Sequence, residues 1–133
     1  MEPLHKELSQ LIIGCFYNVY NTLGRGFSEK VYENALCIEL RKNGLQGIKQ
    51  QEIKVFYEEG IVGDFKADII VNDLIILELK AVLQIVDDHE AQLLNYLRAT
   101  NIEVGYVLNF GSKAEFKRKV YNNDRKYQVK SIE

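Results

Sequence analysis

Residues 64–80 run Asp-Phe-Lys-Ala-Asp-Ile-Ile-Val-Asn-Asp-Leu-Ile-Ile-Leu-Glu-Leu-Lys, and they predict two apolar strands joined by a short turn. The apolar residues around Glu78 indicate that the second strand is largely buried. This strand nevertheless carries Glu78 and Lys80, which share one face because they lie two residues apart. Burying a carboxylate and an ammonium costs several kcal/mol each unless they pair or serve a ligand. The strand is therefore either half-exposed with a surface Glu–Lys pair, or part of a functional site.

Asp68, on the preceding strand, favours the functional site. Two carboxylates from adjacent strands make an oxygen-rich site suited to Mg²⁺ or Mn²⁺, and a nearby lysine can assist an attacking water. The turn between the strands determines whether the carboxylates meet. A two-residue turn at 72–73 sets Asp68 opposite Leu77, on the other face from Glu78. A three-residue loop at 72–74, or an equivalent bulge, sets Asp68 opposite Glu78, so a metal site requires this second register.

The hydrophobic pattern on either side of these strands predicts a mixed sheet flanked by helices. Apolar residues recur at three- and four-residue steps, or alternate with polar ones, in segments that end at Gly or Asn. The expected helices cover residues 6–23, 29–43 and 87–100, and the expected strands cover 53–57, 61–71, 74–81 and 103–110. Three strands followed by a helix and a strand imply a mixed sheet with a crossover. An extended basic tail is expected from residue 113.

Length and composition restrict the class of protein. The 133 residues fit one domain, 1–133, in which 113–133 form a basic C-terminal extension. A hydrophobic content of 47% and a charged content of 27% exclude a mainly disordered or low-complexity chain. The net charge of −2 provides no global cationic field. Apolar runs are far shorter than the roughly 18 residues of a membrane span, and no signal peptide is evident. We expect a cytoplasmic protein with no membrane partner.

Five ordered blocks of sequence resemble a known family. The blocks are Gly26–Tyr32 (Gly-Phe-Ser-Glu-Lys-Val-Tyr), Gly63–Asp68, Glu78–Ala81, Ala91–Thr100, and Asn109–Gly111 with Phe116–Arg118. Together they are similar to the small GxxExxY family within the PD-(D/E)XK nuclease superfamily, over roughly residues 8–121. A Glu-x-Lys element alone is a weak signal, whereas the ordered set is specific. The resemblance implies an α/β, restriction-endonuclease-like fold.

The resemblance also implies roles for individual residues. Asp68 and Glu78 would hold Mg²⁺ or Mn²⁺, with the Leu79 carbonyl as a further ligand, and Lys80 would serve the attacking water. Glu29 matches a helix glutamate that some superfamily members add to the metal shell. If these carboxylates crowd one pocket, their repulsion should raise at least one carboxylate pKa in the metal-free protein.

Further candidates lie on the third helix and in the basic segment. Gln92 and Tyr96 match a Gln-x-x-x-Tyr element of related exonucleases, and their spacing puts them on one helix face. We expect Gln92 and Glu29 to reach the carboxylates from two helices, and Tyr96 to contact substrate. Lys117 and Arg118 belong to a segment, 113–130, with seven basic and two acidic residues. They would follow a phosphate backbone, although a solvated terminus explains this charge equally well.

The function expected from these residues is metal-dependent hydrolysis of phosphodiester bonds in DNA or RNA. Nucleic acid is the expected partner, and a homodimer remains open. One alternative is a non-catalytic nucleic-acid- or protein-binding module that retains the nuclease fold, which should bind without Mg²⁺ and tolerate loss of Asp68. Another is a metal-dependent hydrolase of small phosphorylated molecules, which should ignore polymers.

Overall fold

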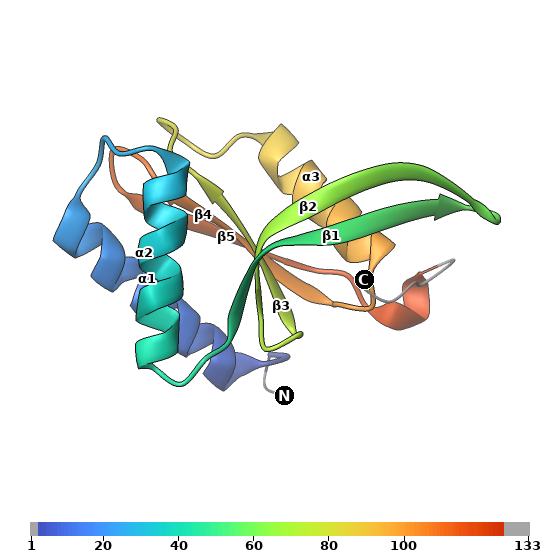
Figure 1. Ribbon diagram of the computed structural model, residues 1–133, viewed down its shortest axis with the longest axis horizontal. Coiled ribbons are helices and arrows are strands. Elements are labelled where there is room, and N and C mark those ends of the chain that lie inside the picture. Colours follow the sequence, from blue (N-terminus) through green and yellow to red (C-terminus); the bar gives the residue numbers. More distant parts are fainter. Residues whose placement is uncertain (1–2, 127–133) are drawn as a thin grey trace.

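The computed structural model describes residues 3–126, which form five strands, three α-helices and a short 3₁₀ helix (Figure 1). In chain order these are α1 (Lys6–Leu23), α2 (Glu29–Lys42), β1 (Gly47–Tyr57), β2 (Gly60–Val71), β3 (Ile75–Lys80), α3 (Asp87–Ala99), β4 (Val104–Phe110), β5 (Ala114–Val120) and η1 (Asn123–Arg125). The predicted α/β class is confirmed, and α1 has the predicted bounds. No helix within residues 3–126 combines the length and the apolar character needed to cross a membrane.

The strands form one mixed sheet in the order β1-β2-β3-β4-β5. The β3–β4 pair is parallel, and the other three pairs are antiparallel. Parallel neighbours need a crossover connection, and α3 supplies it between β3 and β4. The predicted crossover is therefore confirmed.

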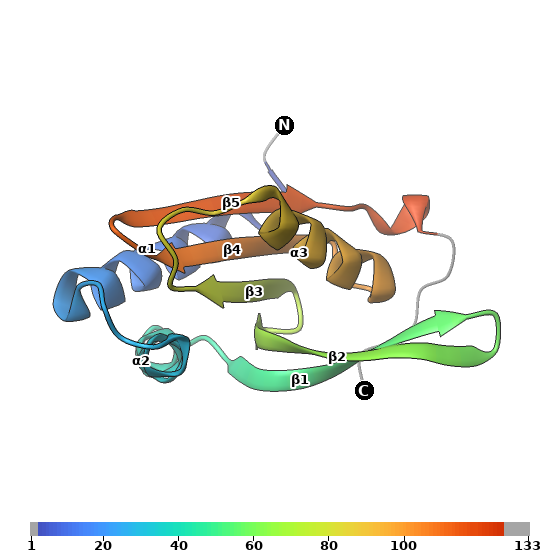
Figure 2. The ribbon, with the colours of Figure 1, turned by 90° about the horizontal axis from the view of Figure 1, so that it is seen from above.

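Helices cover both faces of the sheet (Figure 2). On one face α1 and α2 bury residues such as Phe16 and Leu36 against Leu77. On the other face α3 buries Leu93 against Ile76. Leu77 and Ile76 are consecutive, so β3 is apolar on both sides, as expected of a strand at the centre of a covered sheet. Both faces of β3 are thus closed to water along most of its length.

The hairpin of β1 and β2 extends beyond the rest of the sheet (Figure 1). Only residues 69–71 of β2 pair with β3, whereas β1 and β2 pair with each other from Gly47↔Val71 to Tyr57↔Gly60. We call residues 51–67 the hairpin arm. The arm leaves the sheet at Asp68, which places this residue where two neighbouring strands separate.

The prediction of an extended basic tail is wrong for residues 114–120. These residues form β5, an edge strand paired with β4 from Phe110↔Ala114 to Val104↔Val120. Edge strands of sheets commonly carry charged side chains, which discourage pairing with another chain. The high charge of this segment therefore concealed a strand. Residues 127–133 of the predicted extension lie outside the part of the chain that the structure describes.

Candidate active site

The loop between β2 and β3 has the register that a carboxylate pair requires. Val71 pairs with Ile75, so residues 72–74 form a three-residue loop. Continuing this register sets Asp68 opposite Glu78. Of the two registers that the sequence left open, the structure has the one that a metal site requires.

Where β2 leaves β3, the side chains of Asp68 and Glu78 accept the hydrogen bonds that main-chain carbonyls accept in a regular strand pair. The backbone N–H of Asp68 donates to Oε2 of Glu78 over 3.0 Å, and the N–H of Leu79 donates to Oδ2 of Asp68 over 2.8 Å. Each carboxylate thus accepts a main-chain N–H from the opposite strand. These two bonds hold both acidic groups at the point of strand separation, which is a reason for the strands to part there.

The side chains of β2 change from one face of the sheet to the other at Asp68. Ile69 packs beneath α1 and α2, whereas Ala67, two residues earlier, packs beneath α3. Residues two apart share a face in a regular strand, so β2 is irregular between them. Gln50 lies opposite Asp68, between the pairs Lys49↔Ile69 and Gln51↔Ala67, and has a φ of 56°. This left-handed residue in β1 accounts for the switch, which a pattern of alternating residues cannot reveal.

Burial and mutual repulsion perturb both carboxyl groups. Glu78 is 5% exposed, and its pKa is raised to about 8, mainly by burial and then by the charge of Asp68. The Asp68 N–H and the nearby Lys80 ammonium partly oppose this rise. The pKa of Asp68 is also raised, again chiefly by burial. A raised carboxylate pKa was expected, but desolvation contributes more to it than crowding does.

Lys80 and Leu79 lie beside the pair. Lys80 is half-buried, two residues beyond Glu78 on the same face of β3. Leu79 is fully buried and faces α1 and α2, with its N–H committed to Asp68. The ligand role expected of its carbonyl oxygen stays a prediction.

The Gly-x-x-Glu-x-x-Tyr block positions the start of α2. Tyr32 is fully buried, its ring stacks on Phe110 with centroids 4.2 Å apart, and its hydroxyl donates to the carbonyl of Gly24. The same hydroxyl accepts the N–H of Phe27, which fixes the turn before the helix. Because Tyr32 is used in this way, it presents no free ring for stacking. The block leaves Glu29 exposed at the first turn of α2.

Sequence reasoning missed two residues that contact this site, Glu33 and Gln50. Glu33 is 4% exposed and binds the Lys30 ammonium over 3.0 Å and the Gln50 amide over 2.7 Å. The same amide nitrogen lies 3.4 Å from Oδ1 of Asp68, so Gln50 bridges the two carboxylates. Glu33 follows Glu29 by one helical turn, and this spacing could have revealed it. Gln50 gave no comparable signal, because its role depends on its left-handed backbone.

A small pocket of about 140 Å³ lies between α2 and the separating strands. We call it the acidic pocket, and it is lined by Glu29, Lys30, Glu33, Gln50, Asp68 and Leu79. The pocket thus holds the carboxylates of Glu29, Glu33 and Asp68 and the ammonium of Lys30. Glu29 and Asp68 therefore line one pocket, whereas Glu78 and Lys80 do not line it. The expectation that Glu29 reaches both carboxylates stays a prediction.

Gln92 and Tyr96 lie on the other side of the sheet from α2. They line a second, larger hollow, and the Gln92 amide donates to the Tyr96 hydroxyl over 2.9 Å. Burial raises the pKa of Tyr96, and the charges of Glu78 and Asp68 raise it further, so this tyrosine lies near the pair. Gln92 lines the larger hollow and not the acidic pocket, and the expectation that it reaches Glu78 stays a prediction.

Lys117 and Arg118 lie on β5, which β4 separates from β3. Arg118 bonds to the Tyr106 hydroxyl and to the Leu4 carbonyl. Lys117 is exposed. The structure does not bring either residue to the carboxylates, because the strand order keeps β5 at the far edge.

The oxygen donors at the pair suit a hard divalent cation. Asp68 and Glu78 supply two carboxylates within one hydrogen-bonded unit, and the Leu79 carbonyl follows directly. Across residues 3–126, no group of three or more His, Cys, Asp or Glu side chains could hold an ion. A cation here would therefore complete its shell with main-chain oxygen and water, as Mg²⁺ does in sites with one or two carboxylates.

The fold and the paired carboxylates at a strand separation define the class of restriction-endonuclease-like domains. The family model of the PD-(D/E)XK nuclease superfamily matches residues 6–119, and the chain belongs to this superfamily. No curated protein and no solved structure matches the chain significantly.

Proposed function

We propose that this chain is a divalent-metal-dependent nuclease that hydrolyses phosphodiester bonds of DNA or RNA. The supporting observation is the unit of Asp68 and Glu78, in which each carboxylate accepts a main-chain N–H from the opposite strand. Such an arrangement keeps two acidic groups together in a buried place at a cost in stability. The raised pKa of Glu78, about 8, is a measure of that cost.

The residues have distinct roles in this proposal. A divalent cation held by Asp68, Glu78 and the Leu79 carbonyl would neutralise charge on the scissile phosphate and make the attacking water more acidic. Lys80, on the same face as Glu78, orients this water and offsets the negative charge of the pair. Glu29, exposed at the first turn of α2, shares the acidic pocket with Asp68 and would act on the cation through its bound water rather than as a third carboxylate ligand.

Hydrolysis of fluorescent oligonucleotides tests the proposal. We expect Mg²⁺- or Mn²⁺-dependent cleavage that EDTA abolishes. Asp68→Asn should lower kcat/KM by roughly a thousandfold, because a metal contributes several kcal/mol of transition-state stabilisation. Asp73→Asn is the matched control, because Asp73 lies at the opposite end of the same hairpin with a φ of 57° that asparagine also tolerates.

The second candidate is a non-catalytic module that retains the nuclease fold. It is favoured by the absence, over residues 3–126, of a cluster of three acidic, His or Cys side chains around a single ion position. Nucleic-acid binding that is equal in EDTA and Mg²⁺, unchanged by Asp68→Asn and without cleavage, would establish this candidate and refute the nuclease.

A further inference from the structure

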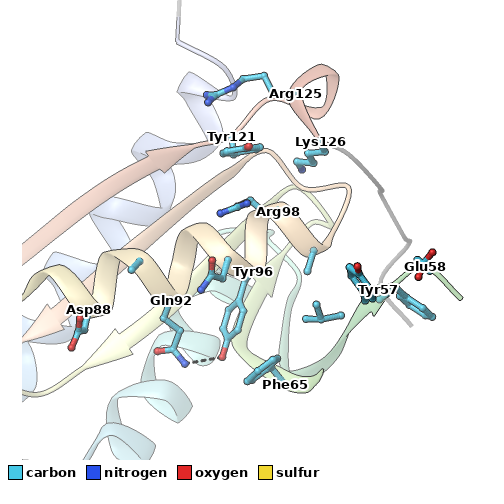
Figure 3. A pocket seen from close by; sticks show the side chains of 15 residues that line it. Tyr57, Glu58, Phe65, Asp88, Gln92, Tyr96, Arg98, Tyr121, Arg125 and Lys126 are labelled. Carbon is cyan, nitrogen blue, oxygen red and sulfur yellow. Dashed lines mark hydrogen bonds between the residues drawn. The ribbon is translucent and has the colours of Figure 1, made fainter. Parts of the chain in front are cut away.

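A large hollow lies between the hairpin arm, α3 and residues 121–126 (Figure 3). Its volume is about 830 Å³, within the range of ligand-binding clefts. We call it the aromatic groove. The residues that matter for its chemistry are Tyr57, Phe65, Tyr96, Arg98, Tyr121 and Arg125.

Aromatic rings of the arm are left open to this groove. Tyr57 is 70% exposed and Phe65 is 44% exposed. The Phe65 ring lies 5.8 Å from the ring of the buried Tyr96, so arm and helix meet through aromatic contact. Exposing large rings in one concave surface is unfavourable in water and marks a binding surface.

Cationic groups lie across the groove from the arm. The guanidinium of Arg125 lies 4.5 Å from the centroid of the Tyr121 ring, and that of Arg98 lies 5.8 Å from it. Both arginines are exposed. Lys126 also lines the groove, but its ammonium is bound to the carbonyls of Thr100 and Ile102.

Two acidic side chains, Glu58 and Asp88, line the same groove. Glu58 lies at the tip of the arm and Asp88 in the first turn of α3 (Figure 3). Both acidic residues lie outside the segment that carries Tyr121 and Arg125. The positive part of the groove is therefore formed by the guanidinium groups of Arg98 and Arg125 beside the Tyr121 ring.

The aromatic groove and Glu78 lie on the same side of the sheet, because Glu78 shares a face of β3 with Ile76, which packs beneath α3. Phe65 precedes Asp68 by three residues on β2, and Tyr96 is close enough for the charges of Glu78 and Asp68 to act on it. A chain molecule lying in the groove would therefore approach Glu78 from its own side of the sheet.

We infer that the aromatic groove binds the unpaired bases of single-stranded nucleic acid, an inference that rests on the proposed nuclease function. Every base has a face that stacks on an aromatic ring, and arginine adds charge for the phosphates. A duplex keeps its base faces stacked inside, so it cannot use Tyr57 and Phe65. The combination of open rings, guanidinium groups and acidic catalytic residues matches a strand whose backbone passes the carboxylates.

Binding is measured by fluorescence anisotropy with a labelled deoxythymidine oligonucleotide of about 12 nucleotides, a length within the usual range of single-strand sites. EDTA is present throughout, so cleavage does not interfere. Tyr57→Ala and Phe65→Ala should each weaken binding by about five- to a hundredfold, the range that stacking on one ring gives. Tyr17→Ala, a 38% exposed tyrosine on α1, is the matched control and should bind as the wild type does.

Arginine substitutions test the electrostatic contribution to binding independently of the aromatic rings. Arg125→Ala should weaken binding and flatten its dependence on salt, because fewer counterions are released. Arg41→Ala, in the last turn of α2, is the control with an exposed arginine outside the groove. Because Arg125 and Tyr57 are exposed, their replacement leaves the core intact.

Several results would overturn the inference. Equal affinity of the wild type, Tyr57→Ala and Phe65→Ala would remove the groove from binding. A duplex that binds as tightly, with the same losses in the variants, would refute the preference for single strands. Self-association on gel filtration that Tyr57→Ala abolishes would assign the groove to a second copy of the chain.

The inference and the proposed function fail separately. Metal-dependent cleavage with no effect of the groove variants on binding would refute only the inference. Groove-dependent binding of single strands without any cleavage in Mg²⁺ or Mn²⁺ would refute the nuclease and keep the groove as a binding site.

Discussion

The acidic pocket and the aromatic groove differ in size and chemistry. The acidic pocket measures about 140 Å³ and contains Glu29, Glu33 and Asp68, whereas the groove measures about 830 Å³ and is bordered by rings and guanidinium groups. The larger hollow has the exposed surface for binding, and the smaller one has the acidic groups for chemistry. Under the proposed function, the larger hollow is therefore the place of binding and not of hydrolysis.

The two hollows also differ in what stabilises them. The acidic pocket depends on the exact placement of buried polar groups, such as the Gln50 amide between Glu33 and Asp68. The groove depends on the position of the arm, which carries exposed side chains. Substitutions in the pocket should change metal affinity and pH dependence, and substitutions in the groove should change the affinity for a polymer.

The largest effect is expected for Glu78→Gln with and without metal. A hundredfold excess of Mn²⁺ over its Kd should stabilise the wild type by about 2.7 kcal/mol and raise its Tm on the order of 4–10 °C. Glu78→Gln cannot ionise, so it avoids the cost of burying a carboxylate or protonating it on folding. It should be slightly more stable without metal and lose the rise. Thermal melting measures both. An equal rise in the two proteins would place the ion elsewhere.

The pH dependence of metal binding should be the next largest effect. Glu78 has a pKa of about 8 when folded against an ordinary 4.5, so it must lose a proton before it binds a cation. Mn²⁺ affinity should therefore rise roughly tenfold per pH unit between about pH 6 and 8, since one proton is released. Isothermal titration calorimetry in buffers of different ionisation enthalpy counts this proton. An affinity that does not vary over this range would contradict the account.

The stability of the metal-free protein should fall as the pH rises, whereas its metal affinity should rise. The folded protein holds the Glu78 proton up to about pH 8, whereas the unfolded chain loses it near 4.5. The contribution of Glu78 to stability is thus present in full below 4.5 and declines as the pH rises through 8. Urea unfolding of the wild type relative to Glu78→Gln isolates this decline, which the variant lacks.

A smaller effect is expected for Gln50→Ala. Loss of the amide leaves Glu33 and Asp68 without their bridge, so the pKa of Asp68 should rise further. Metal affinity should fall about two- to tenfold, as expected for one hydrogen bond of about 0.5–1.5 kcal/mol. Gln46→Ala, an exposed glutamine just before β1, is the control. If both variants bind metal equally well, Gln50 has no positioning role.

Much of the fold could be predicted because local patterns agree with the tertiary structure. The helical spacing of Ile12, Phe16 and Val19 gave the bounds of α1, and these side chains are buried as expected. β5 was missed because its sequence, with Lys117 and Arg118, has the charge of a solvated segment. The start of β1 was missed for the same reason, since polar residues dominate before Ile53.

The candidate site was only partly predictable from the sequence. The juxtaposition of Asp68 and Glu78 followed from strand register, a local property that the loop length fixes. Glu33 and Gln50 depend on how α2 packs on β1 and on one left-handed residue, so spacing along the chain gives little information about them. The separation of Gln92 from Glu29 likewise depends on which face of the sheet each helix covers.

Anomalous diffraction from a crystal of the protein soaked in Mn²⁺ tests the central claim most directly. We predict one strong peak in contact with the carboxylates of Asp68 and Glu78, at the point where β2 leaves β3, and no such peak in Asp68→Asn. A peak only at other carboxylates, or the same peak in Asp68→Asn, would contradict a metal site built on this pair.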